Sequence, residues 1–302
     1  MALLLWGFSC AAWAQPDPFT AVAAAYLVKA DGATLWEKAA DTRLPPASLT
    51  KMMTALLVLE HYDPKAVITV HPDAVAETGS RLGLRKGDRM TLENVLAAAL
   101  IQSSNDACHV LADHVAGNEA RFVQLMNRRA KEWGLRDTHF VNACGHDHAG
   151  HYSSARDLAA LAERALRQPA FARLAATATL DIATIDGRRR FSLENHNALI
   201  GRYTGAVGVK SGYTQRAGKC LVALAQRDGK SVLLVLLNAP NRWWDAVDML
   251  DRAFDMKLSK RDIVPLSPWE RVRSEGGGQG ESLFHYLGQR FALSVGEVRH
   301  AA

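Results

Sequence analysis

The sequence predicts an α+β fold, in which an antiparallel sheet built from both ends of the chain is flanked by helices. Two turn signals carry this prediction, because Asp31-Gly32 and Asp228-Gly229 each separate two short apolar runs in the manner of a β-hairpin. Helical periodicity fills the middle of the chain, so a mainly helical subdomain, about residues 72–180, is expected as an insertion between the two parts of the sheet. The 302 residues, 48% of them hydrophobic, suffice to bury a full core.

The N-terminal half opens with the first hairpin, whose strands are expected at residues 26–28 and 34–36. A helix is expected over about residues 48–61, because Pro45-Pro46 ends the preceding segment just before it. The apolar body of this helix consists of Leu49, Met52, Met53, Leu56, Leu57 and Leu59.

Helical patterns continue over residues 92–101 and 106–115, and a capping box at residues 154–157 precedes a further helix. Towards the C-terminus, residues 206–209 indicate a strand edge before the second hairpin. A last helix, about residues 243–254, is expected to pack on the sheet.

The two ends of the chain differ from its body. Residues 1–14 carry an apolar run that ends in Ala12-Trp13-Ala14, which is typical of a signal peptide, so export is expected, with an ordinary buried N-terminal segment as the alternative. The main domain is expected at residues 18–264, followed by a flexible, glycine-containing tail at 265–302. No other run approaches the roughly 18 apolar residues of a membrane span, so the mature chain is expected to be soluble.

The charge balance favours no nucleic-acid partner. The net charge is +5 and the pI about 9.1, but the basic residues are scattered and no aromatic-basic motif accompanies them. The run Arg188-Arg189-Arg190 beside Gly187 is expected to be a solvated turn.

Three short motifs indicate a serine acyl-transfer site: Ser48-Leu49-Thr50-Lys51, Ser103-Ser104-Asn105 and Lys210-Ser211-Gly212. A serine hydroxyl near neutral pH needs an adjacent base that removes its proton as it attacks a carbonyl. Lys51 can be that base, because positions three apart on a helix lie one above the other. Burial, and the charge of Lys210 nearby, would lower the pKa of Lys51 from about 10.4 towards about 7.

The other motif residues are suited to relay a proton, to form hydrogen bonds with the substrate backbone and to bind a carboxylate. Ser103 and Asn105 are expected in a tight connection between two helices, where a hydroxyl can relay a proton and an amide can hold the substrate backbone. Lys210 and Ser211 suit a terminal carboxylate, and Gly212 permits close approach of a substrate backbone. The oxyanion hole is expected from the backbone N–H groups of Ser48 and Tyr213.

The chain resembles the serine D-Ala-D-Ala carboxypeptidases, which are low-molecular-mass penicillin-binding proteins with a β-lactamase/transpeptidase-like fold. The resemblance runs from about Ala24 to Ala253 and includes, besides the three motifs, residues 83–88, 138–142, 151–158 and 212–218. It implies that Ser48 is acylated, that Lys51 is its base, that peptidoglycan stem peptides are substrates and that β-lactams are covalent inhibitors. Ser104 stands where the family often has glycine, and Ser211 where threonine is commoner.

Several activities remain open within this resemblance. Removal of a terminal D-alanine and cleavage of D-alanyl cross-links by an endopeptidase use the same groups. A β-lactamase would need a Glu-x-x-Leu-Asn pattern between the second and third motifs, which does not occur. A non-catalytic penicilloyl-binding protein is disfavoured by the intact motifs.

Cysteines and histidines raise the question of a metal. Cys108, Cys144 and Cys220 can form at most one disulfide, and Cys108 and Cys220 are expected to be buried small hydrophobes. One group of neighbouring residues could in principle bind zinc: Cys144, His146, His148 and His151, with Asp147. Because the serine mechanism needs no metal, neither a metal nor another cofactor is expected.

Overall fold

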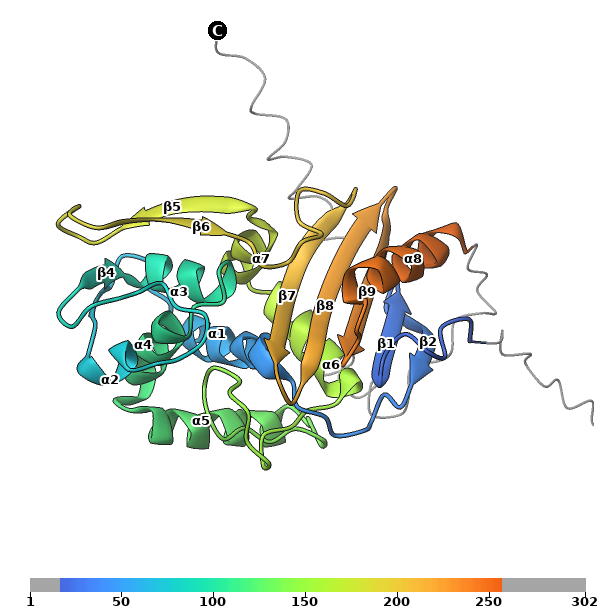
Figure 1. Cartoon of the computed structure of the whole chain (residues 1–302), viewed down its shortest axis with the longest axis horizontal. Coiled ribbons are helices and arrows are strands. Elements are labelled where there is room, and N and C mark those ends of the chain that lie inside the picture. Colours follow the sequence, from blue (N-terminus) through green and yellow to red (C-terminus); the bar gives the residue numbers. More distant parts are fainter. Residues whose placement is uncertain (1–16, 257–302) are drawn as a thin grey trace, which may run out of the picture.

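The centre of the molecule is a five-stranded antiparallel sheet with the strand order β2-β1-β9-β8-β7 (Figure 1). The strands are β1 (Ala25–Ala30), β2 (Ala33–Lys38), β7 (Ala206–Thr214), β8 (Gly218–Arg227) and β9 (Lys230–Leu237). A computed structural model of the chain describes residues 17–256, so the expected signal peptide and tail lie outside the described residues. Pairing of β1 with β9 joins the two ends of the described chain, and β7 forms one edge.

Both predicted hairpins are present. Ala30 pairs with Ala33 and Arg227 with Lys230, so each loop has two residues. The φ angles are 49° and 85° at Asp31-Gly32 and 50° and 77° at Asp228-Gly229. Positive φ at both central positions defines a type I′ turn, whose twist matches the strands on either side.

The sheet is buried on both faces, which explains its long apolar runs. Side chains alternate along each strand, so Leu233, Val235 and Leu237 of β9 enter one core while Val232, Leu234 and Leu236 enter the other. One face is covered by α8 (Arg242–Asp255), the helix expected near residue 243, and the other by α6 (Ala155–Leu166). The result is a helix, sheet and helix arrangement in three layers.

The helical part of the molecule lies beside the β7 edge (Figure 1). Its helices are α1 (Lys51–Leu59), α2 (Pro72–Val75), α3 (Leu92–Leu100), α4 (Asn105–Ala116), α5 (Glu119–Glu132) and α7 (Pro169–Ala176). The helix expected from residue 48 begins instead as a 3-10 turn, Ala47–Thr50, and continues as α1.

Two small antiparallel ribbons, which the sequence patterns did not indicate, accompany these helices. They pair β3 (Val67–Thr69) with β4 (Arg89–Thr91) and β5 (Thr179–Ala183) with β6 (Arg190–Glu194).

The arginine run was only partly predicted correctly. Arg188 is exposed, but Arg189 forms an ion pair with Asp88, donates to the Gly83 carbonyl at 2.7 Å and stacks over Phe191. The predicted solvated turn is therefore wrong for Arg189, which ties the β5-β6 ribbon to the loop before β4. A partner 101 residues away in the sequence holds this side chain.

The predicted capping box is half formed. The Ser154 hydroxyl accepts from the Asp157 backbone N–H at 3.2 Å and so caps α6. The Asp157 carboxylate instead accepts from the Asp137 backbone and the Thr138 hydroxyl, both at 2.8 Å. It therefore anchors the chain before residue 139 to α6.

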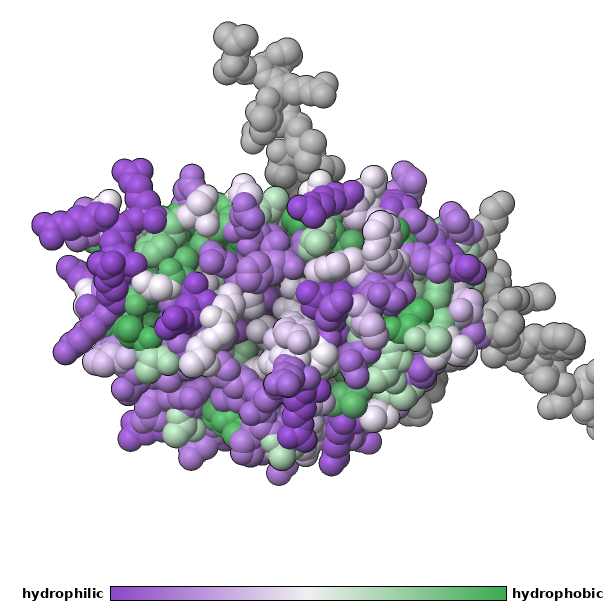
Figure 2. Space-filling view, in the orientation of Figure 1, coloured by the Kyte–Doolittle hydropathy of each residue, from purple (hydrophilic) through white to green (hydrophobic). Residues whose placement is uncertain are grey.

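The surface is mixed. On the face in Figure 2, hydrophobic residues form small patches that hydrophilic ones separate. Within residues 17–256, no helix has the length and apolar character needed to cross a membrane.

Glycine at position 145 is needed where the loop of residues 139–151 packs on the 3-10 turn. A Cβ there would lie 1.9 Å from the Ala47 carbonyl oxygen, whereas a Cβ at Gly83 would meet nothing within 4 Å; both residues have positive φ, 92° and 80°. We expect Gly83→Ala to lower the free energy of unfolding by about 1–2 kcal/mol, and Gly145→Ala to lower it by about 1–3 kcal/mol more. Urea denaturation measures both, and equal losses would contradict the packing.

Candidate active site

Ser48 and Lys51 lie side by side at the start of α1. The Lys51 Nζ lies 3.1 Å from the Ser48 Oγ, within hydrogen-bond distance. In a 3-10 turn, side chains three positions apart eclipse one another, so this turn aligns the pair even more directly than the α-helix expected from the sequence. Ser48 is half-buried and can meet a substrate, while Lys51 is only 1% exposed.

Two further acceptors complete the surroundings of Lys51. Its Nζ lies 2.7 Å from the Asn105 Oδ1 and 2.8 Å from the Cys144 carbonyl oxygen. A neutral amine has two hydrogens and one lone pair. With the hydrogens on Asn105 and Cys144, the lone pair faces the Ser48 hydroxyl, which is the geometry that a general base requires.

The second motif supplies one of these acceptors. Asn105 is the first residue of α4, not part of a loop as expected, and its Nδ2 donates to the Thr78 carbonyl at 2.5 Å. This bond fixes the amide so that its oxygen faces Lys51. Ser103 lies in the connection between α3 and α4 with a φ of 61°. Its role in proton relay, and contact of Asn105 with substrate, stay predictions.

The third motif lies on the edge strand β7. The Lys210 Nζ is buried and donates to the Ser211 carbonyl at 2.9 Å. Burial, followed by the positive charges of Lys51 and Arg242, lowers the pKa of Lys210 well below its usual value. The Ser211 hydroxyl donates to the His196 carbonyl at 3.0 Å.

Gly212 allows the first and third motifs to meet. A Cβ at this position would lie 2.9 Å from the Ser48 backbone nitrogen and 3.0 Å from the Ala47 Cβ. Glycine therefore lets β7 lie directly against the 3-10 turn. Tyr213, the next residue, is 64% exposed, and an oxyanion hole formed by the N–H groups of Ser48 and Tyr213 stays a prediction.

The loop of residues 139–151 joins these parts. Gly145 packs on Ala47, and the Asp147 carboxylate accepts from the Thr214 hydroxyl at 2.5 Å and the Arg216 backbone N–H at 3.0 Å. The loop thus contacts the Ser48 turn at one point and the end of β7 at another.

His151 supports the 3-10 turn that carries Ser48, which the sequence did not indicate. The Thr50 hydroxyl donates to the Ala47 carbonyl at 2.8 Å, so it accepts from the His151 Nε2 at 2.9 Å. The His151 Nδ1 accepts from the Val141 backbone N–H at 3.2 Å. Both nitrogens are therefore satisfied only in the neutral imidazole, and burial, with His139 next, lowers the pKa of His151 to about 4.

Arg242, the first residue of α8, was also missed. Its Nη1 donates to the Gly212 carbonyl at 2.6 Å and the Cys220 carbonyl at 3.2 Å, so it supports β7 next to the third motif. No local pattern marks this arginine, because its acceptors are 22 and 30 residues away in the sequence.

The histidines and cysteines are arranged differently from the zinc cluster considered above. Cys108, Cys144 and Cys220 are buried free thiols, which confirms the burial predicted for Cys108 and Cys220. His151 is committed to Thr50 and Val141, and the His148 Nδ1 accepts from the Gly150 N–H at 3.0 Å. The four predicted ligands therefore do not surround a common point; they are Cys144, His146, His148 and His151.

Comparison with known proteins finds a matching family and several relatives. Residues 11–241 match the family described as D-alanyl-D-alanine carboxypeptidase. The D-alanyl-D-alanine carboxypeptidase DacF of Bacillus subtilis is 36% identical over 239 residues, which cover 76% of this chain and 61% of that protein. The D-alanyl-D-alanine carboxypeptidase DacD of Escherichia coli is 35% identical over 207 residues, which cover 64% of this chain and 52% of that protein. The chain thus spans between half and two thirds of these two relatives.

The match to one solved structure covers almost the whole of that protein. The Streptomyces K15 DD-transpeptidase has a TM-score of 0.73 and 32% sequence identity, over 78% of this chain and 98% of that one.

The neutral state of His151 makes the fold sensitive to acid. Because the pKa of His151 is about 4 in the folded chain and ordinarily 6.5, the unfolded state takes up the extra proton as pH falls from 6.5 to 4. This contribution to stability is present above pH 6.5, and about 2–3 kcal/mol of it should be lost by pH 4. Urea denaturation at each pH should show a flatter profile for His151→Gln than for wild type, whereas the exposed control His148→Gln should follow wild type.

Proposed function

The chain belongs to the D-alanyl-D-alanine carboxypeptidase family, and we propose that it is a penicillin-binding serine carboxypeptidase that removes the terminal D-alanine of peptidoglycan stem peptides. The observation that carries the proposal is the surroundings of Lys51, whose two hydrogens have acceptors in Asn105 and Cys144 and whose third direction faces Ser48.

Acylation follows from this geometry. Neutral Lys51 takes the proton of the Ser48 hydroxyl while the oxygen attacks the carbonyl carbon of the penultimate D-alanine. The backbone N–H groups of Ser48 and Tyr213 stabilise the tetrahedral oxyanion. Protonated Lys51 returns this proton through the Ser103 hydroxyl to the leaving amine of D-alanine, and water then hydrolyses the ester on Ser48.

Recognition of the substrate depends on its free carboxylate. Lys210 and Ser211 lie on the edge strand next to the Ser48 turn, and burial together with the positive charges of Lys51 and Arg242 lowers the pKa of Lys210. A substrate carboxylate favours the charged form of Lys210 by direct electrostatic attraction. A chain that ends in D-alanine is therefore preferred over one that continues.

Cleavage of D-alanyl cross-links by an endopeptidase is the second candidate. It uses the same Ser48 ester, and the Streptomyces K15 relative carries the name DD-transpeptidase rather than carboxypeptidase. A β-lactamase is less well supported, because the partners of Lys51 are Ser48, Asn105 and Cys144, none of which is a carboxylate that could activate water. The intact motifs disfavour a non-catalytic penicilloyl-binding protein.

Peptidoglycan lies outside the cytoplasm, so the proposal includes export to the periplasm or another extracytoplasmic space. The apolar run before Ala12-Trp13-Ala14 supports this location. Fractionation of cells that express the full chain tests it, and accumulation in the cytoplasm with residues 1–14 retained would contradict it.

Acylation by benzylpenicillin tests the nucleophile and base. Intact-mass analysis is expected to show a long-lived adduct on wild type, and Ser48→Ala and Lys51→Ala should each slow acylation by up to about a millionfold, because the pair acts as a unit. The exposed controls Ser192→Ala and Lys65→Ala should acylate at the wild-type rate. Acylation that persists in Lys51→Ala would remove the lysine from its role as base, and rapid turnover without an adduct would favour a β-lactamase.

The low pKa of Lys210 predicts how substrate binding depends on pH. Carboxylate binding requires charged Lys210, so KM for a peptide ending in D-Ala-D-Ala should rise as pH increases through the pKa of Lys210 in the free enzyme. The peptide with an amidated C-terminus should show no such rise. In Lys210→Ala, KM for the free acid should increase about tenfold or more with a smaller change in kcat. A pH profile shared by acid and amide would place the carboxylate elsewhere.

A further inference from the structure

A group of side chains of the kinds that bind metals lies next to the second motif. None of these side chains takes part in the proposed catalysis. Glu77 follows α2, and its Oε2 lies 2.7 Å from the Nε2 of His146 in the loop of residues 139–151. The Cys144 sulfur, the Glu77 carboxylate oxygen and the His146 ring nitrogen all lie within 4.8 Å of one another. We propose that Glu77, Cys144 and His146 bind a zinc ion. This proposal is independent of the proposed peptidase activity.

The donor set favours zinc over harder cations. Thiolate, imidazole and carboxylate are the three side-chain ligands of protein zinc sites, whereas calcium and magnesium select oxygen. In tetrahedral zinc sites the ligand atoms are about 3.3–3.6 Å apart, given metal–ligand distances of about 2.0–2.3 Å. The separations in this cluster, from 2.7 Å to at most 4.8 Å, bracket that range, so small rotamer adjustments suffice.

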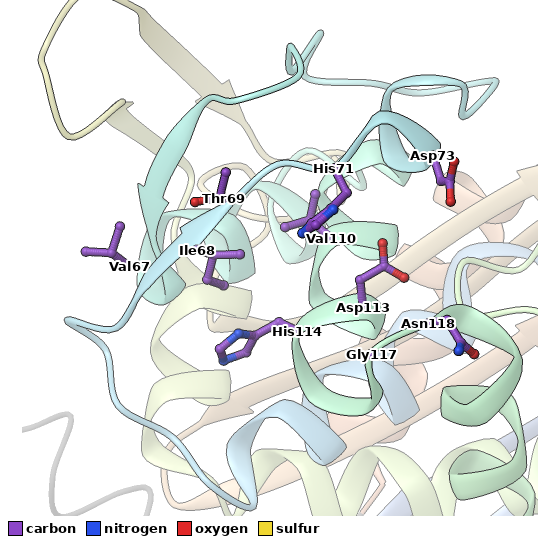
Figure 3. Close-up of a pocket in the computed structure, with 10 residues that line it drawn as sticks. All are labelled: Val67, Ile68, Thr69, His71, Asp73, Val110, Asp113, His114, Gly117 and Asn118. Atoms are coloured by element: carbon purple, nitrogen blue, oxygen red, sulfur yellow. The ribbon is translucent and has the colours of Figure 1, made fainter.

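His109 holds the carboxylate in place. Its Nδ1 lies 2.7 Å from the other Glu77 oxygen, Oε1, and its Nε2 lies 3.6 Å from the Asp113 carboxylate. Asp113 belongs to the wall of a cavity of about 310 Å³ between β3, α2 and α4, where Figure 3 also shows His71 and Asp73. Ligating carboxylates in zinc sites are regularly fixed by such hydrogen bonds from a second group.

The cluster is accessible from solvent on one side. Glu77 and His146 line an open pocket of about 340 Å³ together with Asp73, Ala76 and Thr78. Cys144, by contrast, is buried on the protein side. Three protein ligands and an open fourth direction are typical of a zinc site that keeps one water.

Another triad shares Glu77 but is a weaker candidate. Glu77, His109 and Glu119 also lie within 4.8 Å of one another. The Glu119 Oε1 already accepts from the Ala143 backbone N–H at 2.9 Å, and this triad has no sulfur ligand.

Binding changes protonation in a defined way. The Cys144 thiol releases its proton to solvent and binds as thiolate, and His146 binds through Nε2 with its remaining proton on Nδ1. Thiolate and the Glu77 carboxylate together balance the two charges of the ion. The occupied site is therefore neutral, which is one charge more positive than the empty site with its ionised Glu77, and it lies close to Lys51 through the Cys144 carbonyl.

The test uses the full chain, purified without a histidine tag in reducing buffer, stripped with a chelator and titrated with Zn²⁺ against a chromophoric competitor. We expect one zinc per chain by elemental analysis, together with an increase in Tm. Co²⁺ in place of zinc should give a sulfur-to-metal charge-transfer band that Cys144→Ser removes.

Matched variants separate this site from general metal binding. His146→Ala should weaken zinc binding at least about tenfold, and His109→Gln about 10–100-fold. His148→Ala, in the same loop, and Cys220→Ser, a buried thiol on β8 away from the triad, should bind as wild type. His146 is partly exposed, so its variant should fold, which the melting curve verifies. Substoichiometric zinc in wild type, or wild-type affinity in His146→Ala, would overturn the proposal and leave a hydrogen-bonded Glu77-His146 pair.

Discussion

The buried amine of Lys51 is the constraint on which the arrangement of the site depends. An amine in the protein interior must have its hydrogens accepted, because an unpaired buried polar group costs about 1–3 kcal/mol. The two acceptors come from separate parts of the chain, Asn105 at the start of α4 and Cys144 in the loop, and the 3-10 turn places Ser48 in the third direction around Nζ. The 3-10 turn, α4 and the loop of residues 139–151 therefore meet around one nitrogen atom. The same bonds that make Lys51 tolerable in the interior leave it directed at Ser48.

Features set by local sequence were predictable. The two hairpins follow from Asp-Gly pairs that accept positive φ, and α6 and α8 follow from a capping serine and from helical periodicity. The pairing of Ser48 with Lys51 follows from their spacing, although the turn that aligns them is 3-10 and not α-helical. The ribbons β3-β4 and β5-β6 have strands of three and five residues, too short for a period-2 pattern to be distinguished from loop sequence.

Features set by distant partners were not predictable. Three hydrogen-bonded pairs are far apart in the sequence: His151 and Thr50 by 101 residues, Glu77 and His146 by 69, and Arg189 and Asp88 by 101. A single histidine or arginine looks the same in sequence whether it is solvated or buried against such a partner. Asn105 illustrates the limit within a motif, since its residue type was identified but its orientation towards Lys51 depends on the Thr78 carbonyl.

The loop of residues 139–151 is fastened at both ends of its contact with the site, at Ala47 through Gly145 and at the end of β7 through Asp147. A single residue, His146, separates these two anchors, so a very short segment sets the spacing between the 3-10 turn with Ser48 and the end of β7. An insertion or deletion here would alter the distance between this turn and the edge strand without changing Ser48, Lys51 or Lys210. Because Cys144 of the same loop accepts from Lys51, a change in the length of this loop would reach both the shape of the site and the surroundings of its buried amine.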